Sequence, residues 1–158
     1  MKLKKSNIVL ALAAAFAISG CGSEENEISA GISLPVDTTP PSISIDAAKL
    51  INEPADSVLE NSVRLSLSKA AKEEVTLSYE VTAMTASAGV DFEASAGQIT
   101  IPIGSLSSTI SFRVLPDSLD EDDETFLISI SEPKNATLRT VFTESIITIR
   151  DTDPTPSA

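Results

Sequence analysis

Beyond residue 41 the chain alternates apolar and polar residues with a period of two, and no other feature constrains its fold as much. In the segments 63–67 (VRLSL) and 75–81 (VTLSYEV), every second side chain is apolar and most of the residues between are polar. Because successive side chains of a β-strand point to opposite faces of a sheet, this period predicts strands with one buried face. Seven strands are predicted, with these inward-facing residues: Ile43 and Ile45; Val63, Leu65 and Leu67; Val75, Leu77, Tyr79 and Val81; Ile99, Ile101 and Ile103; Ile110, Phe112 and Val114; Phe126, Ile128 and Ile130; Ile147 and Ile149.

Short strands separated by turn signals, with no helical period in the same region, predict an all-β fold. The predicted fold class is a seven-stranded antiparallel sandwich of immunoglobulin-like type, in which two sheets pack face to face. Because proline cannot donate a hydrogen bond to a ladder, we expect Pro102 at a sheet edge or bulge and Pro116 at the end of a strand. No internal repeat is visible, so the strands form one module rather than an array.

Residues 1–20 have the layout of an export signal peptide. Basic residues precede an uninterrupted apolar run from Ile8 to Ile18. As a helix this run covers roughly 17 Å, which is too short for a hydrocarbon core of ~30 Å. The run leads into the sequence ISGC, which resembles a bacterial lipoprotein signal and ends at Cys21, the only cysteine of the chain. The resemblance implies lipidation of Cys21, and the alternative is an ordinary cleavage site followed by an incidental cysteine.

These features divide the chain into a signal peptide (1–20), a lipidated flexible tether (21–41), a sandwich domain (42–153) and a short tail (154–158). The tether is polar and acidic and ends in a Pro-Pro pair, as is typical of a flexible linker. Gly22 directly follows the lipidated cysteine, and in this position it resembles the residue found in lipoproteins that are sorted to the outer membrane. We therefore expect a protein of the bacterial cell envelope, held to a membrane by its lipid, and held to the outer membrane if the cell is Gram-negative.

The charge balance excludes one class of partner and argues against catalysis. The chain has 23 acidic and 11 basic residues and a formal net charge of −12. Such a surface repels nucleic acid and attracts cations or basic partners, so no nucleic-acid partner is expected. Histidine is absent and the single cysteine is assigned to the lipid, which removes the common nucleophile–base pairs. We expect a protein that is not an enzyme.

Acidic residues concentrate in the segment 117–124 (DSLDEDDE), which contains no basic residue. Two carboxylates about 5 Å apart repel by roughly 3 kcal/mol at an effective dielectric of 20, so the run does not stabilise a fold by itself. Asp91 lies between the third and fourth predicted strands, and Asp151 and Asp153 follow the last. Carboxylates that converge at one pole of the sandwich need a hard cation, and Ca²⁺ takes 6–8 oxygen ligands from flexible loops. A solvated acidic face without a metal is the alternative.

Three short motifs, in a fixed order, carry a resemblance to a known family. The first is 88–92 (AGVDF), the second is the acidic element 116–126 (PDSLDEDDETF), and the third is 149–153 (IRDTD). Over residues 42–153 the chain resembles a Calx-beta domain, the module that senses calcium in sodium–calcium exchangers and recurs in bacterial surface proteins. The resemblance implies the same sandwich fold and Ca²⁺ as the ligand.

Carried over position by position, the resemblance implies a set of metal ligands drawn from four segments. The set is Glu53, Asp91, Asp117, the backbone carbonyl of Leu119, Glu121, Glu124, Asp151 and Asp153. Glu60 is an alternative to Glu53, and Asp122 has no ligand role in the family pattern. Two family acids are replaced, by Pro116 and by Thr152, which predicts one or two bound ions rather than a larger cluster.

Two functions fit these observations. The first is a membrane-anchored, calcium-binding, non-catalytic lipoprotein that serves cell adhesion or binds a partner, either another envelope protein or a surface ligand. The second is a metal-free structural or interaction lipoprotein that uses the same sandwich, for example through an exposed edge strand.

Overall fold

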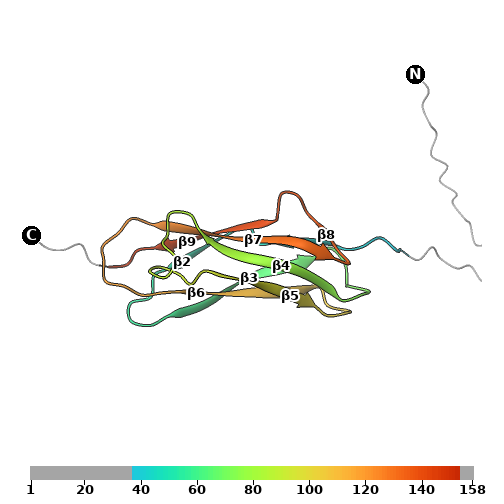
Figure 1. Cartoon of the computed structure of the whole chain (residues 1–158), viewed down its shortest axis with the longest axis horizontal. Helices are drawn as coiled ribbons and strands as arrows, with labels where there is room; N and C mark the ends of the chain where they lie inside the picture. The colour runs from blue at the N-terminus through green and yellow to red at the C-terminus, as the bar shows by residue number, and fades with distance from the viewer. Residues whose placement is uncertain (1–36, 154–158) are drawn as a thin grey trace, which may run out of the picture. The chain divides into compact units, whose positions relative to one another are not determined.

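A computed structural model of the chain describes residues 37–153, which form a β-sandwich (Figure 1). The strands are β1 (Ser42–Ile45), β2 (Ala48–Asn52), β3 (Leu59–Leu67), β4 (Val75–Ala83), β5 (Ser95–Ile101), β6 (Ser107–Val114), β7 (Glu124–Lys134), β8 (Thr137–Leu138) and β9 (Glu144–Arg150). This part of the chain contains no helix that is long and apolar enough to cross a membrane. The predicted signal peptide, Cys21, residues 22–36 of the tether and the tail 154–158 lie outside the described residues.

The strands form two sheets, which confirms the predicted all-β sandwich. One sheet has the order β6-β3-β1-β8 and the other the order β2-β9-β7-β4-β5. The strands run along the long axis of the domain, so the loops that connect them gather at its two ends (Figure 1). The buried hydrophobic residues of the two inner faces make one continuous core. Among the described residues, the buried members of this core lie between Ile43 and Ile149.

The structure has nine strands rather than the seven predicted, and two of its pairings are parallel. The predicted first strand is β1, which pairs antiparallel with β3. After a break at residues 46–47 the chain continues as the first added strand, β2, which pairs in parallel with β9 on the other sheet. At the break, the Asp46 amide donates to the Arg64 carbonyl of the first sheet, and the Ala47 carbonyl accepts from the Ile146 amide of the second. The chain therefore changes sheets within two residues. The second added strand, β8, pairs in parallel with β1 over two residues.

Most residues of the predicted inward faces are buried; Tyr79 and Ile99 are partly buried, and one residue was predicted wrongly. Ile103 was predicted to continue the buried face of Ile99 and Ile101, but it is 68% exposed. The strand ends at Ile101, because Pro102 follows and Gly104 takes a φ of 81° in the turn to β6. Pro102 directly follows an edge strand, and Pro116 comes two residues after β6 ends, as expected for both prolines.

Three phenylalanines fill the core at one end of the sandwich. Phe92 and Phe126 stack with ring centroids 4.4 Å apart, and Phe112 meets Phe126 edge-on at 5.4 Å. Phe92 is completely buried although it lies outside the strands. It brings the loop between β4 and β5 onto the core, because its backbone also bridges to Val114 at the end of β6.

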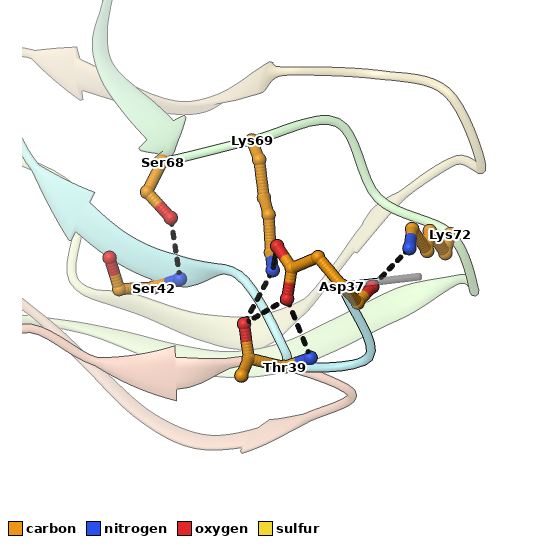
Figure 2. A network of polar contacts seen from close by, with 6 residues as sticks. All are labelled: Asp37, Thr39, Ser42, Ser68, Lys69 and Lys72. Atoms are coloured by element: carbon orange, nitrogen blue, oxygen red, sulfur yellow. Dashed lines mark hydrogen bonds and ion pairs between the residues drawn. The ribbon is translucent and has the colours of Figure 1, made fainter. Parts of the chain in front are cut away.

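Residues 37–41 are part of the folded domain and not of the tether to which the sequence assigned them. Figure 2 shows the polar network that holds them. Asp37 accepts hydrogen bonds from the amide and hydroxyl of Thr39, at 3.0 and 2.7 Å, and from Lys69 Nζ at 2.5 Å. Lys72 Nζ donates to the Asp37 backbone carbonyl, and the Ser42 amide donates to Ser68 Oγ at 3.0 Å. We call this end of the sandwich, formed by residues 37–41 and 68–74, the lysine pole.

Candidate metal centre

The other end of the sandwich collects the acidic segments that the sequence singled out. Strands β2, β4, β6 and β9 all end there, as their registers show: Asn52 pairs with Arg150, Ala83 with Phe126, and Glu124 with Ile149. We call this end the acidic pole and define it by the loops 53–58 and 84–94, the segment 115–124 and residues 151–153. The predicted convergence of four acidic segments at one pole follows from this strand arrangement.

Six carboxylates of the acidic pole form two triads, each with its oxygen atoms within 4.8 Å of one another. The first triad is Glu53, Asp117 and Asp153, and the second is Asp91, Glu121 and Glu124. The first triad takes its residues from three separate segments of the chain, and the second takes them from two, because Glu121 and Glu124 both lie in the acidic run 117–124. Only the long loop between β6 and β7 contributes to both, through Asp117 and Glu121, so this loop connects the two triads.

The first triad is held by backbone hydrogen bonds between the segments. Glu53 follows β2, and its Oε1 accepts a hydrogen bond from the Asp117 amide at 3.0 Å. Its backbone carbonyl accepts from Thr152 Oγ1 at 3.3 Å. Asp117 also orders its own loop, because its Oδ1 accepts from the Leu119 amide at 2.8 Å. These hydrogen bonds alone bring together the end of β2, the acidic loop and the end of β9.

The second triad lies next to the phenylalanine cluster of the core. Asp91 is only 8% exposed, and its Oδ2 accepts a hydrogen bond from the Ser87 amide at 2.6 Å. The next residue is the buried Phe92, which stacks on Phe126, two positions after Glu124. The backbone of Asp91 is fixed further by its carbonyl, which accepts from the Leu115 amide at 2.8 Å. Asp91 is buried and Glu124 partly buried next to this core, whereas Glu121 is exposed on the loop.

A small hollow of about 10 Å³ lies between the triads. It is lined by Glu53, Asp91, Leu115, Glu121, Asp122, Glu124, Ile149 and Asp151. Its size is close to the space that one water molecule needs. Asp151 faces this hollow without belonging to either triad, and its Oδ1 accepts a hydrogen bond from the Asp153 amide at 3.1 Å.

The carboxylates of the triads have no basic partner. Among residues 37–153 the ion pairs are Lys69–Asp37, Arg113–Glu60 and Arg113–Glu93, and none of them involves a triad residue. Burial, followed by the hydrogen bond and charge of Asp91, raises the pKa of Glu124 to about 7. Burial likewise raises the pKa of Glu53, as do the charges of Asp117 and Asp153. For Glu121, desolvation and the charges of Asp117 and Asp91 raise the pKa.

The structure brings most of the predicted ligands together and separates one alternative from them. Leu119 lies in the same loop as Asp117, to which its amide donates. Glu60, the alternative to Glu53, is on β3 and accepts from Arg113 at 2.7 Å. Asp122, which has no ligand role in the family pattern, lines the hollow. In the sequence, the only sign that Asp122 lies at this hollow is that it belongs to the acidic run 117–124.

The donor set determines which cations suit this site. Every side-chain donor of the triads is a carboxylate oxygen, and neither histidine nor cysteine is among them. Oxygen-only ligands on loops suit hard divalent cations, and Ca²⁺ tolerates irregular geometry and many ligands better than Mg²⁺ does. Converging carboxylates with raised pKa values are also the groups that a bound dication would return to the charged form. The residues present therefore fit a calcium ion.

Comparison with known proteins agrees with this geometry. The family model described as the Calx-beta domain matches residues 37–153. The chain belongs to the Calx-beta family. The match begins at Asp37, the residue with which the lysine pole begins. Among curated proteins no sequence matches this Calx-beta chain.

Solved structures show the same sandwich. The apo form of the Calx CBD1 domain shares 25% identity with this chain and has a TM-score of 0.65, and the match covers 72% of this chain and 99% of that domain. The calcium binding domain CBD12 of CALX1.1 shares 24% identity with a TM-score of 0.60, over 70% of this chain and 46% of that one. The Calx CBD2 domain shares 17% identity with a TM-score of 0.62, over 70% of this chain and 86% of the domain. The last two likenesses show the fold alone.

Proposed function

We propose that this Calx-beta chain is a non-catalytic calcium-binding module of the bacterial cell envelope. The observation that carries the proposal is the acidic pole itself. Carboxylates from four segments converge there with no lysine or arginine paired to the two triads within residues 37–153. A folded domain gains nothing from such repulsion unless a cation offsets it.

The two triads suggest how the ions are held. One Ca²⁺ would be held by Asp91, Glu121 and Glu124, of which the first and last lie next to the core. A second would be held by Glu53, Asp117 and Asp153, with Asp151 between the two sites and the backbone carbonyl of Leu119 as a further oxygen. Pro116 and Thr152 stand where the family has acids, so less negative charge is present to hold a third ion.

Calcium would join loops that are otherwise connected only through a few hydrogen bonds. The bound pole would then be a rigid surface, displayed for cell adhesion or for binding another envelope protein or surface ligand. The alternative function is a metal-free structural or interaction module on the same sandwich. The loss of two family acids, at Pro116 and Thr152, is the observation that favours this alternative.

Titration calorimetry of residues 37–158 with Ca²⁺ separates these two functions. The segment contains the two sheets and the hydrophobic core between them, so it is suited to the measurement. We expect binding of one or two ions in the micromolar to millimolar range of extracellular calcium modules, and weaker binding of Mg²⁺. Absence of any heat that EDTA reverses would favour the metal-free module.

The membrane anchor is a separate part of the proposal. Lipidation of Cys21 would attach the chain to the envelope membrane, because acyl chains contribute about 0.8 kcal/mol for each buried CH₂. The full chain should enter the detergent phase on phase partitioning, and a Cys21→Ser variant should leave it. If both partition alike, the anchor is wrong and the calcium site is unaffected.

A further inference from the structure

One side of the sandwich has an open sheet edge at β5. This strand pairs only with β4 and forms the edge of the five-stranded sheet. Apart from that ladder, no backbone hydrogen bond involves residues 95–101 in the described part of the chain. Ser95 and Gly97 are opposite Val81 and Tyr79 and so face inward, yet both are exposed. The ring of Tyr79 lies over Gly97, and the inner layer of the sandwich is left open beside Ser95.

A cleft of about 270 Å³ occupies this open space, between β5 and β6. Tyr79 and Phe112 line it together with Ser95 and Ser111, and the Arg113–Glu60 ion pair (2.7 Å) lies at its wall. An extended segment added along β5 would direct every second side chain into this cleft. Backbone hydrogen bonds to the edge and pockets for alternate side chains are the two requirements of strand addition.

Each of the other sheet edges has a feature that protects at least part of it. Lys49 of β2 extends across to the first sheet, where its Nζ donates to Asn61 Oδ1 at 2.5 Å and to the Ser62 carbonyl at 2.7 Å. Strand β8 has only two residues. The end of β6 is covered, because the Glu93 amide donates to the Arg113 carbonyl. Strand β5 has seven residues (SAGQITI) with no charge and no proline, although charge and proline are the usual means of blocking an edge.

We propose that β5 pairs with β5 of a second copy of this chain, antiparallel about a twofold axis at Gln98. Self-pairing of one edge gives an isologous, closed interface and joins two five-stranded sheets into one. With Gln98 on the axis, Gly97 of each copy is opposite Ile99 of the other. The half-buried Ile99 side chain would then lie beside the partly exposed ring of Tyr79, where Gly97 presents no side chain of its own.

If two copies of the chain meet, charge favours contact at this edge over contact at other surfaces. Two chains of net charge −12 repel, and β5 is an approach without charged residues. Antiparallel pairing also places the acidic pole of one copy beside the lysine pole of the other, so that the two sets of carboxylates stay apart. The proposal uses no metal ligand and does not depend on calcium binding.

Disulfide trapping tests the contact in the full chain. In a Cys21→Ser background, which has no other cysteine, Gln98→Cys should form a disulfide-linked dimer on mild oxidation, because the two thiols meet at the axis. The matched control is Thr109→Cys, an exposed polar residue on the neighbouring edge strand β6, which should remain monomeric. Equal cross-linking of the two variants, or none at position 98, overturns the proposal.

A charge at the same position tests the interface without a covalent bond. Sedimentation should show a dimer for the parent chain, and Gln98→Lys should weaken it by about tenfold or more, because two ammonium groups face each other across the axis. Gln98→Thr, which keeps the edge neutral, should still dimerise. A parent chain that is monomeric at high concentration, or a dimer that the lysine does not weaken, overturns the proposal. Circular dichroism of both variants shows that they are folded.

Discussion

The two poles of the sandwich place carboxylates in opposite electrostatic settings. At the lysine pole the carboxylate of Asp37 is hydrogen-bonded by Lys69 and by Thr39, and the two other carboxylates of this pole, Glu73 and Glu74, are exposed. At the acidic pole six carboxylates form two triads, none of which is paired with a basic residue in the described part of the chain. The two poles lie at opposite ends of the same two sheets, and they differ in the side chains that surround their carboxylates.

The ionisation of the two poles shows what this difference means. The hydrogen bond from Lys69 holds the pKa of Asp37 well below its usual range. At the other pole, burial and the neighbouring Asp91 raise the pKa of Glu124 to about 7. At the lysine pole a lysine of the same chain therefore offsets the charge of Asp37, whereas at the acidic pole only protons or a bound cation would offset the charges of the two triads.

The largest expected effect is that of calcium on thermal stability. A ligand that binds only the folded state adds about 2.7 kcal/mol at a hundredfold excess over Kd, which for a domain of this size is a rise in Tm of roughly 6–16 °C. Scanning calorimetry in millimolar Ca²⁺ and in EDTA measures it. A Lys69→Ala variant should show the full rise, since it leaves the acidic pole intact. An identical Tm in both buffers would mean that the acidic pole, like the lysine pole, needs no metal.

The next effect separates two acids of the same loop. Glu124→Gln should weaken calcium binding by about tenfold or more, because Glu124 is a partly buried ligand at the start of β7 and affinity follows the charge of the ligands. Asp122→Asn should change the affinity by less than about threefold, because Asp122 is exposed and belongs to neither triad. Calorimetric titration of the two variants measures the difference. Equal losses would show that only the total charge of the pole matters.

The metal-free domain should become less stable as the pH rises. Glu124 keeps its proton to a higher pH in the folded state than in the unfolded state, so the folded state binds more protons between pH 4.5 and about 7. Stability therefore falls through this window, on the order of 2 kcal/mol. Urea unfolding in EDTA at pH 5 and pH 8 measures it. Glu124→Gln should flatten the slope, and a stability that rises over this range would refute the raised pKa.

The smallest effect is expected at the lysine pole. Lys69→Ala removes one partner of an exposed ion pair, and exposed pairs contribute little to stability. The loss in Tm should be smaller than any shift above and should vanish in 1 M salt, where charges are screened within about 3 Å. Thermal melts at low and high salt measure it. A loss as large as the effect of calcium would mean that the fold depends on the lysine pole.

The period of two predicted the sandwich but not all of its strands. Each long strand shows its buried face in the sequence, because side-chain alternation is a local property. In β2 only Ile51 is buried, so this strand has no alternating pattern in the sequence. It forms because it pairs with β9, which is far away in the sequence. Ile103 continued the local pattern, yet the turn at Gly104 ended the strand before it.

The sequence predicted which residues form the candidate site but not how they are arranged. The acids could be assigned to one pole because the strands that precede them end there. Their division into two triads depends on the path of the loop 115–123, in which the Asp117 amide bonds to Glu53 and Glu121 turns to Asp91. A loop of this kind has no periodicity, so its path cannot be read from its residues.

The parallel pairing of β2 with β9 has a mechanical consequence. The described chain begins at the lysine pole and ends at the acidic pole, so tension on its two ends acts along the strands. The five residue pairs between β2 and β9 are then sheared together, and they cannot be unzipped one after another. Glu53 directly follows β2 and Asp153 comes shortly after β9, and both belong to the first triad. A cation held there would clamp the ends of the two strands that bear the load, so that the force needed to open the domain would depend on the metal.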